Sequence, residues 1–247
     1  CTYEAGDVEY AADCGTLVVP ENRSNPNSRL IALPILRIRS TGENPGAPIF
    51  DLGGGPGDSN MGFSRVSWFI ENHDIVSLGF RGVDGSVVLA CPEISEHIRH
   101  LPGDMLGAAS LGAMATAYAQ CAARLQNEGV DLDGYTVIEM IDDIEAARNA
   151  LDYEQLDLLS GSYGTRVAQV YAWMYPESIH RSIMISVNPF YAEFVPFSRT
   201  ERCIRISIRV NDDRIGRVLQ FSQITIDSWY DKEETIVIAC RNNHYAR

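Results

Sequence analysis

A short stretch of the chain, residues 156–176, places the tightest constraint on how it can fold. Residues 156–159, three leucines and Asp157, are expected to form a strand, the sequence S-G-S-Y-G follows at 160–164, and residues 165–175 have the pattern of a helix that Pro176 ends. A strand that turns sharply into a helix projects the middle side chain of the turn, here Ser162, away from the sheet. Small residues at Ser160 and Gly164 would let strand and helix pass closely. The stretch therefore predicts that Ser162 is presented as a nucleophile.

A glycine-rich turn follows another expected strand, residues 48–52, and reads G-G-G-P-G at 53–57. Attack by a serine on an acyl group creates negative charge on oxygen, which two backbone N–H groups commonly stabilise, one of them from the residue after the nucleophile. We therefore expect Tyr163 as one donor and Gly55 as the other, with Gly54 as the next choice. A glycine-rich turn can also bind phosphate, but this one lacks the Lys-Ser/Thr of a P-loop and the spacing of a dinucleotide-binding turn.

The remainder of residues 1–189 alternates strands with helices. Further strands are expected at 15–19, 30–38, 75–78 and 182–187, and further helices at 61–72, from 111 to about 129, and from 136 to about 151. This alternation favours an α/β fold with a mostly parallel central sheet flanked by helices. Residues 190–247 lose the rhythm and contain a single glycine, Gly216. We interpret them as an atypical C-terminal tail, either a reduced cap remnant or an altered segment, with 235–240 as a candidate late core strand.

Two local signals concern the helix expected from residue 136. Thr136 and Glu139 have the spacing of a capping box, in which each side chain accepts a hydrogen bond from an otherwise unpaired backbone N–H. The acidic pair Asp142 and Asp143 follows on the same helix, where we expect solvated or capping charges. Before this helix, we expect Gly129 to end the preceding one in a left-handed conformation.

Composition excludes several classes of function. The formal net charge of −13 repels phosphate backbones, and the basic residues form no continuous stripe, so a nucleic-acid partner is not expected. No stretch approaches the roughly 18 uninterrupted apolar residues that would span a bilayer, so no transmembrane segment is expected. Metal ions and organic cofactors are not implied by any motif.

The chain has six cysteines without a C-x-x-C pair or a Cys/His spacing typical of zinc. We expect the disulfides Cys1–Cys14, Cys91–Cys121 and Cys203–Cys240, while reduced, buried thiols are the alternative. An even count favours an oxidising compartment, and a cysteine in first place also fits a lipid-anchored bacterial protein, a processed signal peptide or an arbitrary boundary. The expected location is secreted, periplasmic or associated with the cell envelope.

Several stretches together resemble one branch of the α/β-hydrolases, the secreted tripeptidyl-aminopeptidase and prolyl-iminopeptidase-like serine hydrolases of bacteria. The resemblance covers roughly residues 14–188. It is carried by C-G-T-L-V-V-P-E-N-R at 14–23, G-G-P-G at 54–57, R-G at 81–82 followed by Ser86, D-I-E-A-A-R at 143–148 and S-G-S-Y-G-T at 160–165, continued by Y-A at 171–172 and Y-P at 175–176. It implies a Ser-Asp-His triad, an oxyanion hole at the glycine-proline loop, a cap inserted before the acid, and release of N-terminal residues from peptides or hydrolysis of esters and amides. The implied partner is a small peptide, amide or ester substrate.

The chain departs from this branch at several positions. Gly79-Phe80 stands where the branch usually has an Asp-Pro-like pair, and Asp84 where a glycine is common. Among histidines after Ser162, His180 would begin a strand at the wrong end for catalysis, which leaves His244 as the candidate base.

The identity of the catalytic acid stays open. In one interpretation it is Asp213 or Asp227. In the other, residues 234–240 form the next strand of the branch and Asn243 occupies the place of the acid. The catalytic histidine then lies beyond Arg247. Two functions of different classes follow from this ambiguity. The first is a serine hydrolase acylated at Ser162, and the second is an inactive hydrolase fold that serves as a binding partner, because an unassisted serine hydroxyl is a weak nucleophile.

Overall fold

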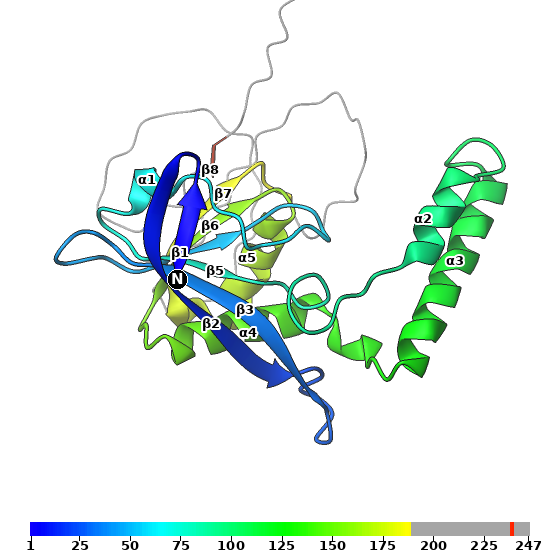
Figure 1. Ribbon diagram of the computed structural model, residues 1–247, viewed down its shortest axis with the longest axis horizontal. Helices are drawn as coiled ribbons and strands as arrows, with labels where there is room; N and C mark the ends of the chain where they lie inside the picture. The colour runs from blue at the N-terminus through cyan, green and yellow to red at the C-terminus, as the bar shows by residue number, and fades with distance from the viewer. Residues whose placement is uncertain (189–237, 240–247) are drawn as a thin grey trace, which may run out of the picture.

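The computed structural model describes residues 1–188 and 238–239, and these form one eight-stranded sheet with helices around it (Figure 1). The strands, in chain order, are β1 (Thr2–Ala5), β2 (Val8–Pro20), β3 (Leu30–Ile38), β4 (Ile49–Leu52), β5 (Ile75–Leu78), β6 (Leu156–Gly161), β7 (Ile179–Ile185) and β8 (Ile238–Ala239). The helices are α1 (Val66–Phe69), α2 (Pro92–Arg99), α3 (Ala108–Asn127), α4 (Val137–Ala150) and α5 (Gly164–Met174), with 3₁₀ turns at Leu132–Gly134 and Pro176–Ser178.

The sheet has a parallel half and an antiparallel half, in the spatial order β1-β2-β3-β5-β4-β6-β7-β8. Strands β5, β4, β6, β7 and β8 are mutually parallel, whereas β1, β2, β3 and β5 pair antiparallel. A short loop can join only antiparallel neighbours, and the connection from β2 to β3 is such a loop. Parallel neighbours need longer crossovers: α1 lies in the one from β4 to β5, and α5 lies in the one from β6 to β7. The predicted α/β class is confirmed, and the parallel part is confined to the centre and one side of the sheet.

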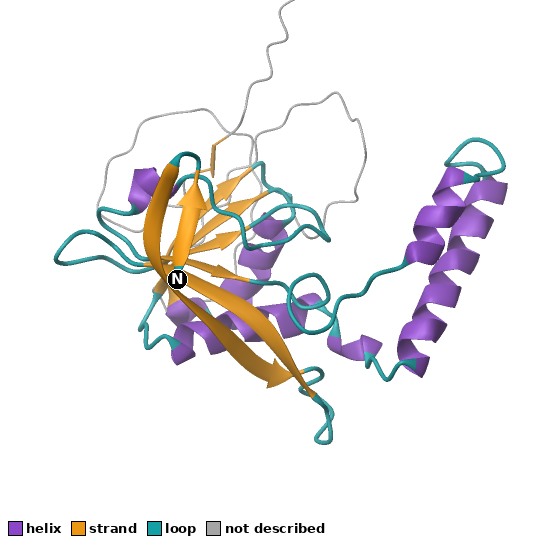
Figure 2. Cartoon of the chain, viewed as in Figure 1, coloured by secondary structure: helices purple, strands orange, loops and turns teal. Residues whose placement is uncertain are grey.

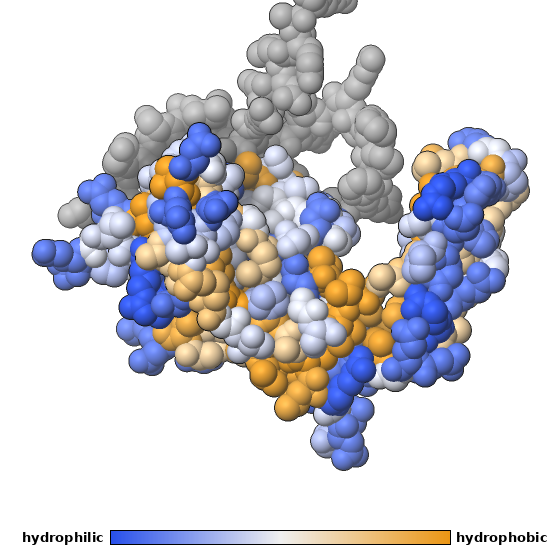
Figure 3. Space-filling view, viewed as in Figure 1, coloured by the Kyte–Doolittle hydropathy of each residue, from blue (hydrophilic) through white to orange (hydrophobic). Residues whose placement is uncertain are grey.

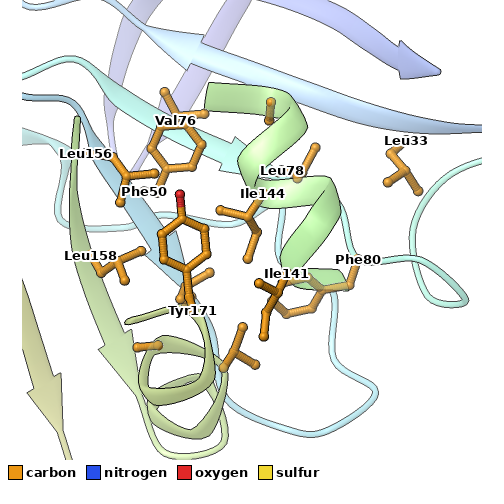
Figure 4. Packing of buried hydrophobic residues seen from close by; sticks show 14 of the residues in the cluster. Leu33, Phe50, Val76, Leu78, Phe80, Ile141, Ile144, Leu156, Leu158 and Tyr171 are labelled. Atoms are coloured by element: carbon orange, nitrogen blue, oxygen red, sulfur yellow. The ribbon is translucent and has the colours of Figure 1, made fainter. Parts of the chain in front are cut away.

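The core lies on both faces of the central strands, because successive strand residues point to opposite faces. Phe50 and Leu158 pack with Tyr171 of α5 on one face, which Figure 4 shows from close by, and Ile49 packs with Val66 of α1 on the other. All four residues of β5 are buried, the pattern of a strand covered on both sides. The Tyr171 hydroxyl reaches through this core and donates a hydrogen bond of 2.6 Å to Glu145 of α4.

The helix expected at 61–72 is wrong at both ends, since α1 covers only Val66–Phe69. At the first end, the reason is a contact from a distant part of the chain. The Tyr3 hydroxyl accepts a hydrogen bond from the Phe63 amide and donates one to the Phe63 carbonyl, so these backbone groups are satisfied without a helix. Phe63 is nevertheless buried. The apolar periodicity in the sequence therefore indicates which residues pack in the core, and it does not indicate how far the helix extends.

A hairpin of α2 and α3 projects from the sheet (Figures 1 and 2). Helix α3 and its left-handed end at Gly129, with φ +83°, were expected, whereas α2 was not. Helix α2 has no buried residue, and in the face drawn in Figure 3 hydrophilic residues cover most of the hairpin. Its attachment to α3 therefore depends on the Cys91–Cys121 disulfide and on Arg124, whose guanidinium lies 2.6 Å from the Glu93 carboxylate.

Two of the three expected disulfides are present. Cys1 pairs with Cys14, with 5.8 Å between their Cα atoms, and Cys91 pairs with Cys121, with 5.5 Å between theirs. The first closes the β1–β2 hairpin and the second joins α2 to α3. Cys203 and Cys240 lie outside the described residues. No helix in the described part of the chain is both long and apolar enough to cross a membrane.

Only half of the expected capping box forms at the start of α4. Thr136 caps the helix as predicted, because its hydroxyl oxygen accepts a hydrogen bond of 3.2 Å from the Glu139 amide. Glu139 does not return the bond. Its carboxylate instead accepts from the backbone N–H of Arg23 at 2.7 Å and from the Arg23 guanidinium at 2.6 Å. An ion pair with a residue 116 positions away has replaced the local cap.

Asp143 is likewise neither solvated nor a capping charge. It is 1% exposed and holds Arg81, itself 4% exposed, through two hydrogen bonds of 2.7 Å. Arg23 donates a further bond of 2.7 Å to the same carboxylate. Arg81 also donates to the carbonyls of Glu21 and Gly134. The cluster is well supplied with partners, as buried charges require, and it joins the end of β2, the turn after β5 and helix α4.

We expect Asp143→Ala to lower the free energy of unfolding by about 3–5 kcal/mol, because it leaves the buried Arg81 guanidinium without its principal counter-charge. Urea denaturation followed by circular dichroism measures this. Glu96→Ala is the control, since it removes an exposed pair with Arg99 and should cost less than about 1 kcal/mol. Similar small changes in both variants would contradict the importance of the cluster.

Candidate active site

The turn between β6 and α5 has the geometry expected from its sequence. Ser162 is exposed at the end of a strand whose first five residues are buried, and its φ of +49° lies in the left-handed region. A residue other than glycine rarely adopts this conformation, and at a functional site it persists only where surrounding structure enforces it. Tyr163 follows directly, and burial raises the pKa of its phenol.

Neighbouring backbone holds the turn in place. The Ser162 amide donates a hydrogen bond of 3.0 Å to the Ile185 carbonyl at the end of β7. The Ser162 carbonyl accepts from both the amide and the hydroxyl of Thr165, at 3.1 and 2.7 Å. The Thr165 hydroxyl oxygen, fully buried, also accepts a 2.9 Å bond from the Asn188 amide. The turn is therefore bonded both to its own helix and to the segment that follows β7.

The small residues around Ser162 lie against the neighbouring strands β4 and β7. A Cβ on Gly164 would lie 2.1 Å from the Leu52 carbonyl oxygen and 2.6 Å from that of Gly53, so α5 begins in direct contact with the end of β4. Ser160 is 1% exposed and donates its hydroxyl to the Ile183 carbonyl at 3.1 Å. Glycine at 164 is thus a steric requirement, while a serine at 160 finds a partner on β7.

The glycine-rich loop lies beside the serine. A Cβ on Gly54 would come within 3.5 Å of the Ser162 Cβ, although the two residues are more than 100 positions apart. Gly55 and Gly57 have φ of +114° and +97°, values that side chains disfavour, and the Gly55–Pro56 peptide is cis. Parallel pairing of β4 with β6, with Leu52 opposite Ser160, brings the two turns to the same edge of the sheet.

Asn60, which no sequence pattern singled out, holds this loop at its start. It is buried, its side-chain oxygen accepts from the Gly53 amide at 2.8 Å, and its side-chain nitrogen donates to the Asp51 and Leu78 carbonyls at 3.0 and 2.9 Å. One side chain thus joins the ends of β4 and β5 to the first glycine of the loop. A polar residue soon after a glycine-rich turn was the available signal, but its three partners cannot be read from the sequence.

Asp51 is a second buried polar residue at the base of the loop. Burial raises its pKa to about 6, and the Arg65 guanidinium, 3.9 Å from the carboxylate, acts in the opposite direction. Because the folded-state pKa is raised, ionisation of Asp51 opposes folding, and the stability associated with its neutral form is lost as pH rises from about 4 to about 6.

The structure does not bring a histidine to Ser162 among the described residues. His244 and the candidate acids Asp213 and Asp227 lie outside them. His180 is the second residue of β7, at the end of the strand remote from the turn, where its Nδ1 lies 2.9 Å from Asp157. The remaining described histidines are His73, also near Asp157, and His97 and His100 in the region of α2.

One group of side chains in the described part of the chain has the spacing of metal ligands: Cys91, Glu93 and Cys121. Both sulfur atoms are joined in the disulfide, so they are not available as thiolate ligands. At the end of β6, the described residues place an exposed serine beside the glycine-rich loop.

A family model described as alpha/beta hydrolase fold matches residues 52–203, more than half of the chain. The chain belongs to the alpha/beta hydrolase fold family. Tripeptidyl aminopeptidase of Streptomyces lividans is 30% identical over 193 residues, covering 71% of this chain and 35% of that protein. Serine protease Hip1 of Mycobacterium tuberculosis H37Rv is 26% identical over 191 residues, covering 69% of this chain and 35% of its own. The matched region is about a third of the length of these relatives.

Among solved structures, a putative epoxide hydrolase from Pseudomonas aeruginosa aligns with 71% of this chain and 42% of its own, with 16% identity and a TM-score of 0.41. For an alpha/beta hydrolase, the strand–turn–helix at Ser162 and the loop after β4 are the expected positions of the nucleophile and of the oxyanion donors. The resemblance to the tripeptidyl-aminopeptidase branch that the sequence motifs indicated agrees with the two peptidase relatives.

We expect Gly164→Ala to destabilise this alpha/beta hydrolase by about 3 kcal/mol or more, because the added methyl group would overlap the Leu52 carbonyl. Gly112→Ala is the matched control. Gly112 also lies in a helix, but a Cβ there meets nothing within 4 Å, so the replacement should raise stability by about 0.5–1 kcal/mol. Thermal and urea denaturation of both variants provide the measurement, and a Gly164→Ala protein as stable as the parent would refute the close contact.

Proposed function

We propose that this chain is a serine hydrolase that cleaves peptide, amide or ester bonds through an acyl-enzyme on Ser162. The observation that carries the proposal is the exposed, left-handed Ser162 beside the glycine loop. That arrangement costs conformational energy and exposes a hydroxyl, which a purely structural turn has no reason to do.

In the proposed reaction the Ser162 oxygen attacks the carbonyl carbon of the substrate, and its proton passes to a general base. The tetrahedral intermediate carries its negative charge on the former carbonyl oxygen, which the amides of Tyr163 and Gly55 stabilise, with Gly54 as the alternative second donor. One such donor is worth about 3–4 kcal/mol of transition-state stabilisation. The intermediate collapses as the bond to the leaving amine or alcohol breaks and that group takes up the proton; water then hydrolyses the ester.

His244 is our proposed base, and its role is a proposal from the sequence alone. We also propose that residues 1–189 are the hydrolase core and that residues 190–247 contain a reduced cap or altered segment. The parallel pairing of Ile238–Ala239 with β7 supports a late core strand there. The two disulfides support a secreted, periplasmic or cell-envelope location, because such bonds persist in oxidising compartments.

A fluorophosphonate probe tests the nucleophile directly. We expect covalent labelling of the parent at Ser162, located by peptide mass spectrometry, and no labelling of Ser162→Ala, whose side chain is exposed and whose fold should be retained. His244→Ala should slow labelling if that residue is the base. A folded parent protein that resists the probe would favour the alternative of an inactive hydrolase fold that binds a partner.

The substrate class is the finer part of the proposal: peptides with a free N-terminus. The relative named tripeptidyl aminopeptidase supports it. We expect a tripeptidyl p-nitroanilide with a free amine to be hydrolysed at least about tenfold faster, in kcat/KM, than the same compound acetylated at its N-terminus, because loss of one charged contact to a substrate commonly costs more than 1.4 kcal/mol. Equal rates would indicate a general amidase or esterase instead.

A further inference from the structure

The glycine loop is held not only at its start, by Asn60, but also at its exit, by a residue from a different connection. Asp84, in the turn after β5, accepts a hydrogen bond from the Ser59 hydroxyl at 2.6 Å and another from the Asn60 amide at 3.1 Å. The same carboxylate accepts from the Phe80 amide, within its own turn, at 2.9 Å. One side chain thus joins the end of the loop to the turn that leads into the buried Arg81.

Room for this contact depends on Gly79. A Cβ at that position would lie 2.6 Å from the Asp84 Cβ and 2.7 Å from Pro34 Cγ. The turn after β5 therefore accommodates a single side chain at this point, and that side chain is the Asp84 carboxylate. Gly79 and Asp84, which stood out in the sequence as separate departures, form one structural unit.

The hydrogen bonds continue from Asp84 to the loop itself. Asp84 fixes the backbone of Asn60, and the Asn60 side chain fixes the Gly53 amide and the carbonyl ends of β4 and β5. Residues 53–60 are therefore anchored at both ends through Asn60, while Gly55 and Gly57 between them have the conformational freedom of glycine. Without the anchor, donors on such a loop would lose the fixed orientation on which stabilisation of an oxyanion depends.

We propose that Asp84 is a positioning residue for the oxyanion loop, acting through Ser59 and Asn60 rather than by contact with substrate. The inference rests on the proposed function in one respect: the loop is taken to supply the oxyanion donor. Asp84 is part of neither the nucleophilic turn nor the set of donors. Its contribution is geometric, so an uncharged side chain of the same shape should preserve most of it.

The test compares Asp84→Ala, Asp84→Asn and Asp13→Ala. Asparagine can still accept from the two amides through its oxygen, while its nitrogen donates to Ser59, whose hydroxyl can accept. Asp13 is the matched control, because its carboxylate accepts several hydrogen bonds, from Arg37 and Arg39, and joins β2 to β3. All three variants are measured for thermal stability, for the rate of Ser162 labelling by a fluorophosphonate over a range of probe concentrations, and for amide exchange of residues 53–60.

We expect Asp84→Ala to lower the maximal labelling rate roughly ten- to a hundredfold with little change in the half-saturating probe concentration, since misplaced donors slow bond formation rather than binding. Asp84→Asn should stay within about threefold of the parent. Asp13→Ala should label at the parent rate even where it lowers the melting temperature. Amide exchange of residues 53–60 should accelerate in Asp84→Ala alone.

The outcomes separate the two proposals. A parent that is labelled at Ser162, together with Asp84→Ala labelled at the parent rate, would overturn the positioning role and leave the hydrolase proposal intact. A parent that is not labelled would refute the hydrolase proposal; amide exchange then decides the positioning role, which unchanged exchange of residues 53–60 in Asp84→Ala would overturn.

Discussion

The site depends on one close contact, in which the first residue of α5 touches the carbonyl oxygens at the end of β4. The contact is possible because residue 164 has no side chain. It brings the turn after β6 against the loop after β4, so two segments more than 100 residues apart are locked together at one edge of the sheet. Packing at this point acts together with the hydrogen bonds of the Ser162 backbone to place the serine beside the glycine loop.

Around that contact, single side chains form hydrogen bonds with several backbone groups each. The Thr165 hydroxyl donates to the carbonyl of Ser162 in the turn and accepts from the backbone of Asn188 after β7. Asn60 uses one amide to hold two strand ends and the glycine loop. Both are buried and have all their bonds within the protein, so each is expected to be costly to replace by an apolar residue that would leave several partners unsatisfied.

Sequence patterns predicted the elements whose signals are local. Residues 30–38 and 75–78 form strands at the expected bounds, and the turn at Ser162 and the end of α3 at Gly129 also agree. Patterns failed where a distant residue supplies the partner. The Tyr3 hydroxyl prevents the expected helix from including Phe63, and Arg81 draws Asp143 into the core. Such contacts span about 60 residues, and neither periodicity nor capping statistics contains information about them.

The residues of the candidate site likewise include some with local sequence signals and others that depend on distant contacts. Ser162 and the glycine loop could be named from sequence because an exposed nucleophile and oxyanion donors impose local rules on residue size and backbone conformation. A general base imposes no such rule, since any histidine that the fold brings within reach will serve, and the residues that hold the glycine loop act through tertiary contacts. Parallel topology explains the difference: it gathers the ends of β4, β5 and β6 at one edge, and the polar residues following each strand acquire their partners only when the sheet has formed.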